Sequence, residues 1–136
     1  MTLPPASPIP PGVTVRQVGK VQVWEKQTPH YPLTQVRAVV GQFGASVFGA
    51  KAVQGLTAMG LQPQHAVAAI LMLKPTHFLK SMTSEEDPTH TLWQDVYHGP
   101  TPNGTAYIKF MIFYPPARSS TALQPPPKLV ISFKRL

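Results

Sequence analysis

The chain of 136 residues contains no cysteine, which excludes disulfide bonds and thiolate metal sites. It also lacks a long apolar run: the longest, Ala66 to Leu73, is too short to cross a bilayer. Residues 1–12 have neither a basic start nor an apolar stretch, so we expect no signal peptide. The simplest expectation is a cytoplasmic protein that makes no membrane contact.

Acidic residues are scarce, with five Asp and Glu against twelve Lys and Arg and a net charge of +7. A metal-dependent nuclease needs several carboxylates from separate elements, whereas Glu85, Glu86 and Asp87 fall together in one predicted loop. The five histidines lack metal-ligand spacing, so we expect no metal and no cofactor. The basic excess favours a polyanionic partner, nucleic acid first, although many soluble domains are basic for solubility alone.

Proline divides the chain. Residues 1–24 are predicted to form a proline-rich leader, disordered at least to residue 12, and residues 25–136 a single domain. The loose alternation within 13–24 fits either an extra strand or a continuation of the leader. Residues 115–127 contain five prolines and are predicted to form a mobile loop.

Apolar periodicity predicts the elements of the domain. Helical spacing indicates helices over residues 33–43, 49–59 and 63–73, followed by a short turn from Pro75 that carries Lys80. The period then changes to two, which predicts strands over 89–97, 105–114 and 128–134, the first two joined by a hairpin at 102–104. The expected fold is α+β, with N-terminal helices packed on a C-terminal antiparallel sheet.

Polar residues interrupt these apolar strands. Alternation predicts that Tyr107, Lys109, Ser132 and Lys134 share the sheet face turned away from the helices. Lysine can stabilise phosphate charge or move a proton, tyrosine can donate to a phosphate, and Gln94 can orient a phosphate or a base. Taken singly, the two lysines fit solvated surface residues better.

The chain resembles the MqsR toxin family through five blocks in the expected order: Lys26–His30, Phe78–Thr83, His90–Tyr97, Ala106–Phe110 and Leu129–Lys134. The resemblance implies an α+β fold related to the RelE-like ribonuclease toxins. It implies metal-independent and ribosome-independent cleavage of mRNA at short GC-containing sequences. It also implies a partner, an MqsA-like antitoxin that binds zinc and carries a helix-turn-helix.

The resemblance assigns catalytic roles to Lys80, Gln94, Tyr107 and Lys134. Residues predicted to bind the RNA around them are Lys26, His30, His90, Lys109 and Arg135. Cleavage by the RNA's own 2′-hydroxyl is expected to leave a 2′,3′-cyclic phosphate and a 5′-hydroxyl.

Two alternatives stay open at this stage, a non-catalytic RNA- or DNA-binding module and a degenerate toxin that only titrates its antitoxin. The leader 1–24, the acidic loop 83–89 and the insertion 115–127 depart from the family pattern. These differences affect the expected cleavage sequence and the expected docking of the antitoxin more than the expected reaction.

Overall fold

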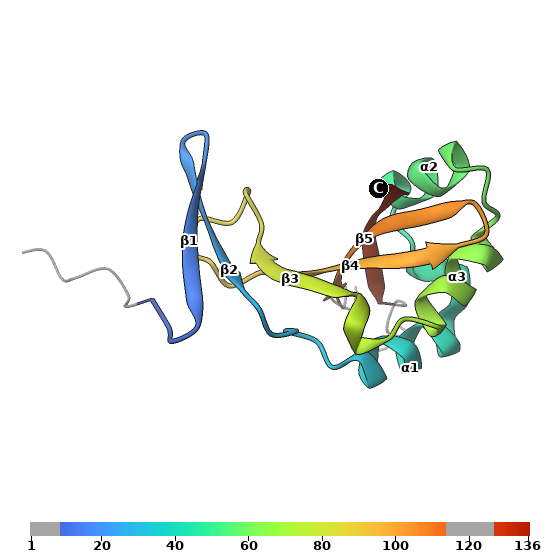
Figure 1. Cartoon of the computed structure of the whole chain (residues 1–136), viewed down its shortest axis with the longest axis horizontal. Helices are drawn as coiled ribbons and strands as arrows, with labels where there is room; N and C mark the ends of the chain where they lie inside the picture. The colour runs from blue at the N-terminus through green and yellow to red at the C-terminus, as the bar shows by residue number, and fades with distance from the viewer. Residues whose placement is uncertain (1–8, 114–126) are drawn as a thin grey trace, which may run out of the picture.

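The computed structural model describes residues 9–113 and 127–136. Within them, one antiparallel sheet has the spatial order β1-β2-β3-β4-β5-β6 (Figure 1). Its strands are β1 (Val13–Val18), β2 (Val21–Lys26), β3 (Phe78–Thr83), β4 (Trp93–Thr101), β5 (Gly104–Phe113) and β6 (Lys128–Arg135). The helices are α1 (Leu33–Phe43), α2 (Ala50–Ala58) and α3 (Pro63–Leu71), with short 3-10 turns η1 (Gly44–Val47) and η2 (Pro75–His77).

The sheet begins before the helices, which corrects the predicted order of elements. β1 and β2 form a hairpin that turns at Gly19, whose φ of 59° suits glycine. β2 then pairs with β3 through Glu25 and Met82, and through Lys26 and Ser81. The helices therefore form one long crossover between two neighbouring strands. The α+β class is confirmed, but the arrangement of N-terminal helices followed by a C-terminal sheet is wrong.

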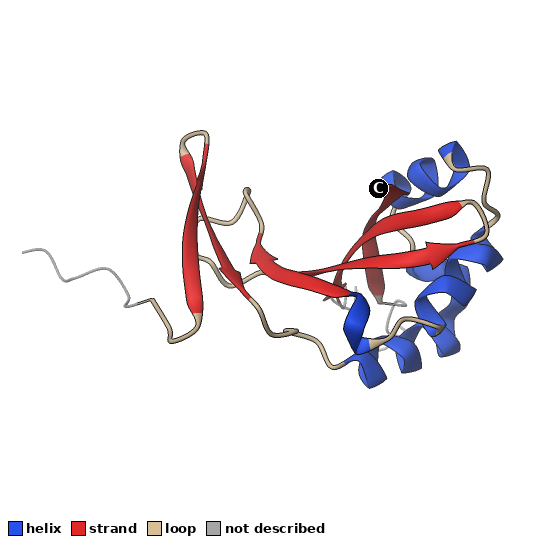
Figure 2. Cartoon of the chain, viewed as in Figure 1, coloured by secondary structure: helices blue, strands red, loops and turns tan. Residues whose placement is uncertain are grey.

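The hairpin and the helices lie at opposite ends of the molecule in the view of Figures 1 and 2. Residues 13–24, which the alternation left undecided, thus form strands and a turn. The pattern was weak because most side chains of β1 are exposed, so few of them needed to be apolar. The hairpin extends the sheet well beyond the part that the helices cover.

Lys80 lies in a strand and not in a helical turn. The 3-10 turn that Pro75 begins ends at His77, and the chain is extended from Phe78 onward. β3 pairs with β2 on one side and with β4 on the other. Pairing with these two neighbours makes the segment a strand, and its six residues alone do not indicate this conformation.

The three predicted helices are confirmed, with ends within two residues of the predicted ones. Strands β5 and β6 also match their predictions closely, whereas β4 starts four residues later than predicted because residues 84–92 form a loop. Of the predicted leader 1–24, residues 1–8 lie outside the described residues, and so do residues 115–126 of the predicted loop 115–127. Among the helices described, none is long and apolar enough to cross a membrane.

The main core lies between one sheet face and the helices. Its largest fully buried side chains are Tyr97, Phe110, Phe133, Leu56, Ile70, Leu73, Ile108 and Leu129. A smaller cluster of Val23, Met82 and Val96 lies apart from this core, with Val18 and Tyr107 packed against it. This second cluster joins the hairpin to the middle of the sheet.

Helix α2 packs directly on β6 at Gly55. A Cβ added to this glycine would lie 1.8 Å from the carbonyl oxygen of Phe133, so the two backbones approach too closely for any side chain. β6 is the last strand of the sheet, and α2 covers it. The close approach also holds the strand that carries Lys134.

Candidate active site

The four predicted catalytic residues lie on one face of the sheet, turned away from the main core. Cross-strand partners point to the same face of an antiparallel sheet. Lys80 pairs with Val96, which in turn pairs with Lys109, and Tyr107 pairs with Lys134. Gln94 lies two residues before Val96 in β4, and its alternation places it on the same face. We call this surface the open face.

Tyr107 and Lys134 are direct neighbours on the open face. The Lys134 ammonium lies 5.2 Å from the centre of the Tyr107 ring. Burial raises the pKa of the Tyr107 phenol, and the nearby Arg16 guanidinium opposes this rise. The phenol therefore keeps its proton at neutral pH and can donate it or hydrogen-bond to a phosphate oxygen.

Lys80 is held by an ion pair that spans two strands. Its Nζ lies 3.0 Å from Glu25 Oε1, and Arg16 Nε lies 2.9 Å from the same oxygen. The Lys80 and Glu25 side chains are only 22% and 14% exposed, so the pair is more constrained than a surface salt bridge. The arrangement fixes the Lys80 ammonium against Glu25, on the side of β3 that faces the hairpin.

Gln94 borders a polar hollow of about 410 Å³ on the open face. The hollow is lined by Lys51, Met82, Ser84, Glu85, Glu86, Gln94 and Lys109. Burial lowers the pKa of Lys109, and the positive charges of Lys51 and Lys134 lower it further, against the opposing effect of Glu85. A half-buried ammonium near two other cations is well placed to receive an anionic ligand.

Lys26 and His30 lie on the opposite face of the sheet. The Lys26 ammonium lies 2.9 Å from His30 Nδ1 and 4.2 Å from the centre of the Trp93 ring. Burial lowers the pKa of both Lys26 and His30. The buried Asp95 carboxylate accepts hydrogen bonds from the backbone N–H groups of His30 and Tyr31, which fixes this segment. The two residues form a group separate from the four on the open face.

His90 and Arg135 also lie away from the four residues. The His90 ring stacks on Trp24 with centroids 4.4 Å apart, and its Nε2 lies 3.0 Å from the Gln22 carbonyl oxygen. Arg135 Nη1 donates to the Asn103 carbonyl oxygen at 2.9 Å, in the turn between β4 and β5. Of the predicted RNA-binding residues, only Lys109 joins the open face.

Three charged residues near the site were not predicted, namely Arg16, Glu25 and Lys51. Arg16 and Glu25 come from the hairpin, and their place follows only once β2 is known to pair with β3. Lys51 comes from α2 and reaches the hollow because that helix covers the edge of β6. In residues 9–113 and 127–136, no three His, Asp or Glu side chains form a group that could hold a metal ion.

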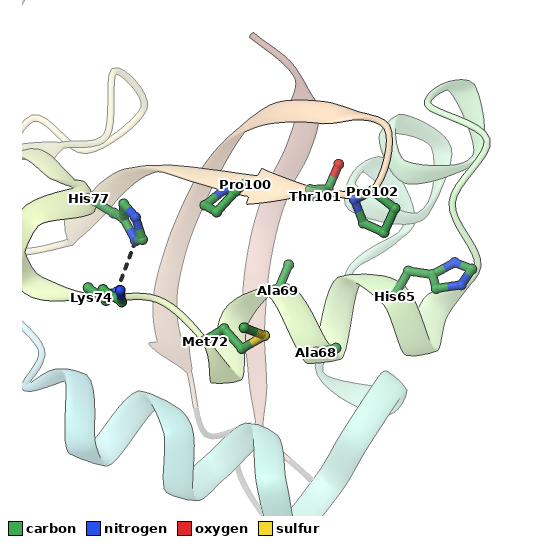
Figure 3. Close-up of a pocket in the computed structure, with 9 residues that line it drawn as sticks. All are labelled: His65, Ala68, Ala69, Met72, Lys74, His77, Pro100, Thr101 and Pro102. Carbon is green, nitrogen blue, oxygen red and sulfur yellow. Dashed lines mark hydrogen bonds between the residues drawn. The ribbon is translucent and has the colours of Figure 1, made fainter.

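A second hollow, of about 390 Å³, lies on the helix side between α3 and the end of β4 (Figure 3). Its lining is mainly apolar and includes Ala69, Met72, Pro100 and Pro102. None of the predicted site residues borders it. The open face is therefore the better candidate for chemistry.

The open face carries lysines and a protonated phenol on an antiparallel sheet, and these groups can bind and polarise a phosphodiester. Residues 28–135 match the family described as "Motility quorum-sensing regulator, toxin of MqsA". The chain is 34% identical over 90 residues to the mRNA interferase toxin MqsR of Escherichia coli (strain K12), an alignment that covers 66% of this chain and 89% of that relative.

The chain therefore belongs to the MqsR toxin family, and with it to the endoribonuclease toxins of the mRNA interferase class. No solved structure matches the chain. Its relation to RelE-like toxins stays a prediction. The family match begins at residue 28, so both strands of the N-terminal hairpin lie outside it.

Proposed function

We propose that the chain is the toxin of a type II toxin–antitoxin pair and cleaves mRNA on the open face of its sheet. The observation that carries this proposal is the register of β3, β4, β5 and β6, which gives Lys80, Gln94, Tyr107 and Lys134 one common face. Four polar groups contributed by four neighbouring strands suit a single extended RNA segment. The partner is an MqsA-like antitoxin, in keeping with the family description.

In this mechanism the RNA supplies the nucleophile, its 2′-hydroxyl, which gives up its proton to a hydroxide ion from solvent and attacks the adjacent phosphorus. The pentavalent transition state gains negative charge, and the ammonium groups of Lys80 and Lys134 stabilise it. Gln94 positions the scissile phosphate or a neighbouring base. Bond breakage releases the 5′-oxygen, which must take up a proton as it leaves.

Tyr107 is the proton donor or a phosphate ligand in this scheme. Burial raises the pKa of the phenol, so it is protonated at neutral pH and can donate to the departing oxygen, which is the more basic of the two. The small apolar cluster of Val23, Met82 and Val96 lies beside the phenol. It limits water near the reacting groups and so strengthens their electrostatic effect.

The substrate is mRNA free of the ribosome, cut at short GC-containing sequences. Mapping the 5′ ends of transcripts after brief expression of the toxin tests this preference. We expect cuts within such sequences, and the same cuts on purified transcripts without ribosomes. Cuts found only in translated RNA would contradict the ribosome-independent part of the proposal.

The direct test incubates purified protein with RNA in the presence of EDTA and analyses the ends of the product. We expect cleavage, with 2′,3′-cyclic phosphate and 5′-hydroxyl ends. Lys80→Ala should lower the cleavage rate at least about 100-fold, since it removes a cation from the developing charge. Lys74→Ala is the matched control, because this exposed lysine lies on the helix side and should have no effect.

The Lys80→Ala variant should also abolish growth arrest while its thermal unfolding stays close to that of the wild type. The Arg16–Glu25 pair remains in the variant, so Glu25 keeps one cationic partner. RNA that binds but stays intact would favour a non-catalytic binding module. Full toxicity of Lys80→Ala would remove this residue from the mechanism.

A further inference from the structure

We propose that the N-terminal hairpin is a working part of the RNA-binding surface, in which Arg16 contacts a backbone phosphate beside the scissile one and Glu25 positions Arg16 and Lys80. This inference rests on the proposed function of the open face. It assigns two residues of the segment before residue 28, where the family match begins.

The geometry of the hairpin carries the first step. Arg16 pairs across the hairpin with Val23, and Val23 belongs to the apolar cluster on the open face. Cross-strand partners share a face, so Arg16 points toward the same side as Lys80 and Tyr107. Val18, two residues further along β1, packs against the same cluster. The hairpin therefore adds its inner side chains to the open face.

Glu25 links the hairpin to the predicted catalytic residues. One of its oxygens, Oε1, bonds both Arg16 Nε and Lys80 Nζ, at 2.9 and 3.0 Å. A single carboxylate between two cations leaves a net positive charge at this point. The Glu25 side chain is only 14% exposed and the Lys80 side chain 22%. Because both groups are largely shielded from solvent, the carboxylate holds the ammonium in one position.

Arg16 is the exposed member of this group. Its side chain is 51% exposed, and within the described part of the chain Glu25 is its ion-pair partner, through Nε. A guanidinium carries four further N–H donors on its two terminal nitrogens, in a planar fork that matches phosphate oxygens. Its charge also acts on Tyr107, which shows that the hairpin reaches the electrostatic surroundings of the phenol.

These contacts identify the ligand as a phosphodiester of the RNA strand. An acidic peptide is the other anionic candidate, but three further cations lie on the same face: Lys80 on β3, Lys109 on β5 and Lys134 on β6. Arg16 adds a cation one strand beyond Glu25. Cations spread over four strands of one face fit a chain that carries a phosphate at every nucleotide.

The test compares Arg16→Gln with Lys20→Gln in the full-length protein. Both changes remove one positive charge from the hairpin, but Lys20 lies exposed in the turn between β1 and β2. We measure KM and kcat for a single-stranded RNA containing the mapped cleavage site, over a range of salt concentrations. For Arg16→Gln we expect KM to rise about tenfold at low salt, with kcat within about twofold of the wild type. The slope of log kcat/KM against log salt concentration should become shallower by about one, which corresponds to the loss of one phosphate contact.

Lys20→Gln should leave both the KM and the salt dependence unchanged. Arg16→Lys, which keeps the charge, should retain the salt dependence of the wild type. A role of Arg16 in packing alone would not produce this difference between Gln and Lys. Glu25→Gln should lower kcat as well as raise KM, because it releases Lys80 together with Arg16.

The inference is overturned if wild-type protein cleaves the RNA while Arg16→Gln keeps the KM and salt dependence of Lys20→Gln. It is overturned as well if Arg16→Gln cleaves normally but is no longer neutralised by the antitoxin, which would assign the hairpin to the protein partner. Failure of the proposed function looks different, since the wild type itself would then leave the RNA intact.

Discussion

Lys134 and Tyr107 face each other across β5 and β6, with the ammonium 5.2 Å from the centre of the aromatic ring. The contact places the Lys134 ammonium beside the Tyr107 phenol, which keeps its proton at neutral pH. One phosphate could then contact the ammonium and the phenol together. The two residues should therefore act as a unit and not as independent contributors.

The first prediction concerns this pair. Tyr107→Phe keeps the ring and removes the hydroxyl, so we expect the cleavage rate to fall about 100-fold or more while the fold stays intact. Lys134→Met should cause a loss of similar size. The double variant should lose less than the product of the two single losses. Single-turnover cleavage rates of the four proteins form the cycle that measures this coupling.

The pH dependence of cleavage checks the role of the phenol. A raised pKa means that Tyr107 stays protonated up to and beyond pH 10, the usual value for tyrosine. If the protonated phenol is the donor, its contribution is present at lower pH and is lost only as the pH rises through this raised pKa. A rate limited by Tyr107 that declines already between pH 7 and 9 would exclude the phenol as the donor.

The second prediction tests the contact between α2 and β6. Gly55→Ala should lower the free energy of unfolding by about 2–4 kcal/mol, because the added methyl group would overlap the Phe133 carbonyl and force the helix away from the strand. Urea unfolding measures the change. The displacement also moves β6, so cleavage by the folded fraction should fall as well.

Gly41→Ala is the matched control for this change. Gly41 also lies inside a helix, α1, but a Cβ added there meets no atom within 4 Å. Alanine is the better helix former, so this variant should be more stable than the wild type by about 0.5–1 kcal/mol. Equal effects of the two substitutions would show that helix propensity, and not the close approach, governs Gly55.

Local periodicity allowed the helices and the last strands to be predicted. Val36, Val40, Leu56 and Ile70 are buried at helical spacing, and Ala106, Ile108 and Phe110 alternate with Tyr107 and Lys109 between the core and the open face. Those patterns arise because one side of each element is buried. They also placed Tyr107, Lys109, Ser132 and Lys134 together on the face away from the helices, as the register confirms.

The hairpin contribution could not be predicted in the same way. Glu25 and Lys80 are 55 residues apart, and their contact depends on the pairing of β2 with β3 across a crossover of three helices. Lys26 and His30 failed to join Lys80 for a related reason. Lys26 is next to Glu25, and adjacent residues of a strand point to opposite faces.

The third prediction concerns the acidic loop that forms one wall of the hollow. The Asp87 carboxylate accepts hydrogen bonds from the backbone N–H groups of Thr89, Thr91 and Leu92 and from the Thr89 hydroxyl. The Thr89 hydroxyl, followed by these backbone groups, lowers the pKa of Asp87 to about 2. One ionised side chain therefore organises the whole loop.

A lowered pKa stabilises the folded state only where the carboxylate is ionised. The stabilisation is complete above the ordinary value of about 4 and is lost as the pH falls from about 4 to about 2. The thermal midpoint of the wild type should therefore drop over this range by more than that of Asp87→Asn, which cannot titrate. Glu86→Gln, an exposed neighbour in the same loop, should follow the wild type.

Hydrogen exchange locates the effect. At pH 7 the amides of Thr91 and Leu92 should exchange faster in Asp87→Asn than in the wild type, since a neutral amide oxygen is a weaker acceptor than the carboxylate. Because Ser84, Glu85 and Glu86 of the same loop line the hollow beside Gln94, KM for RNA should change along with this exchange. Unchanged amide exchange in Asp87→Asn would show that the loop is held by other contacts, and the predicted pH dependence would then have no basis.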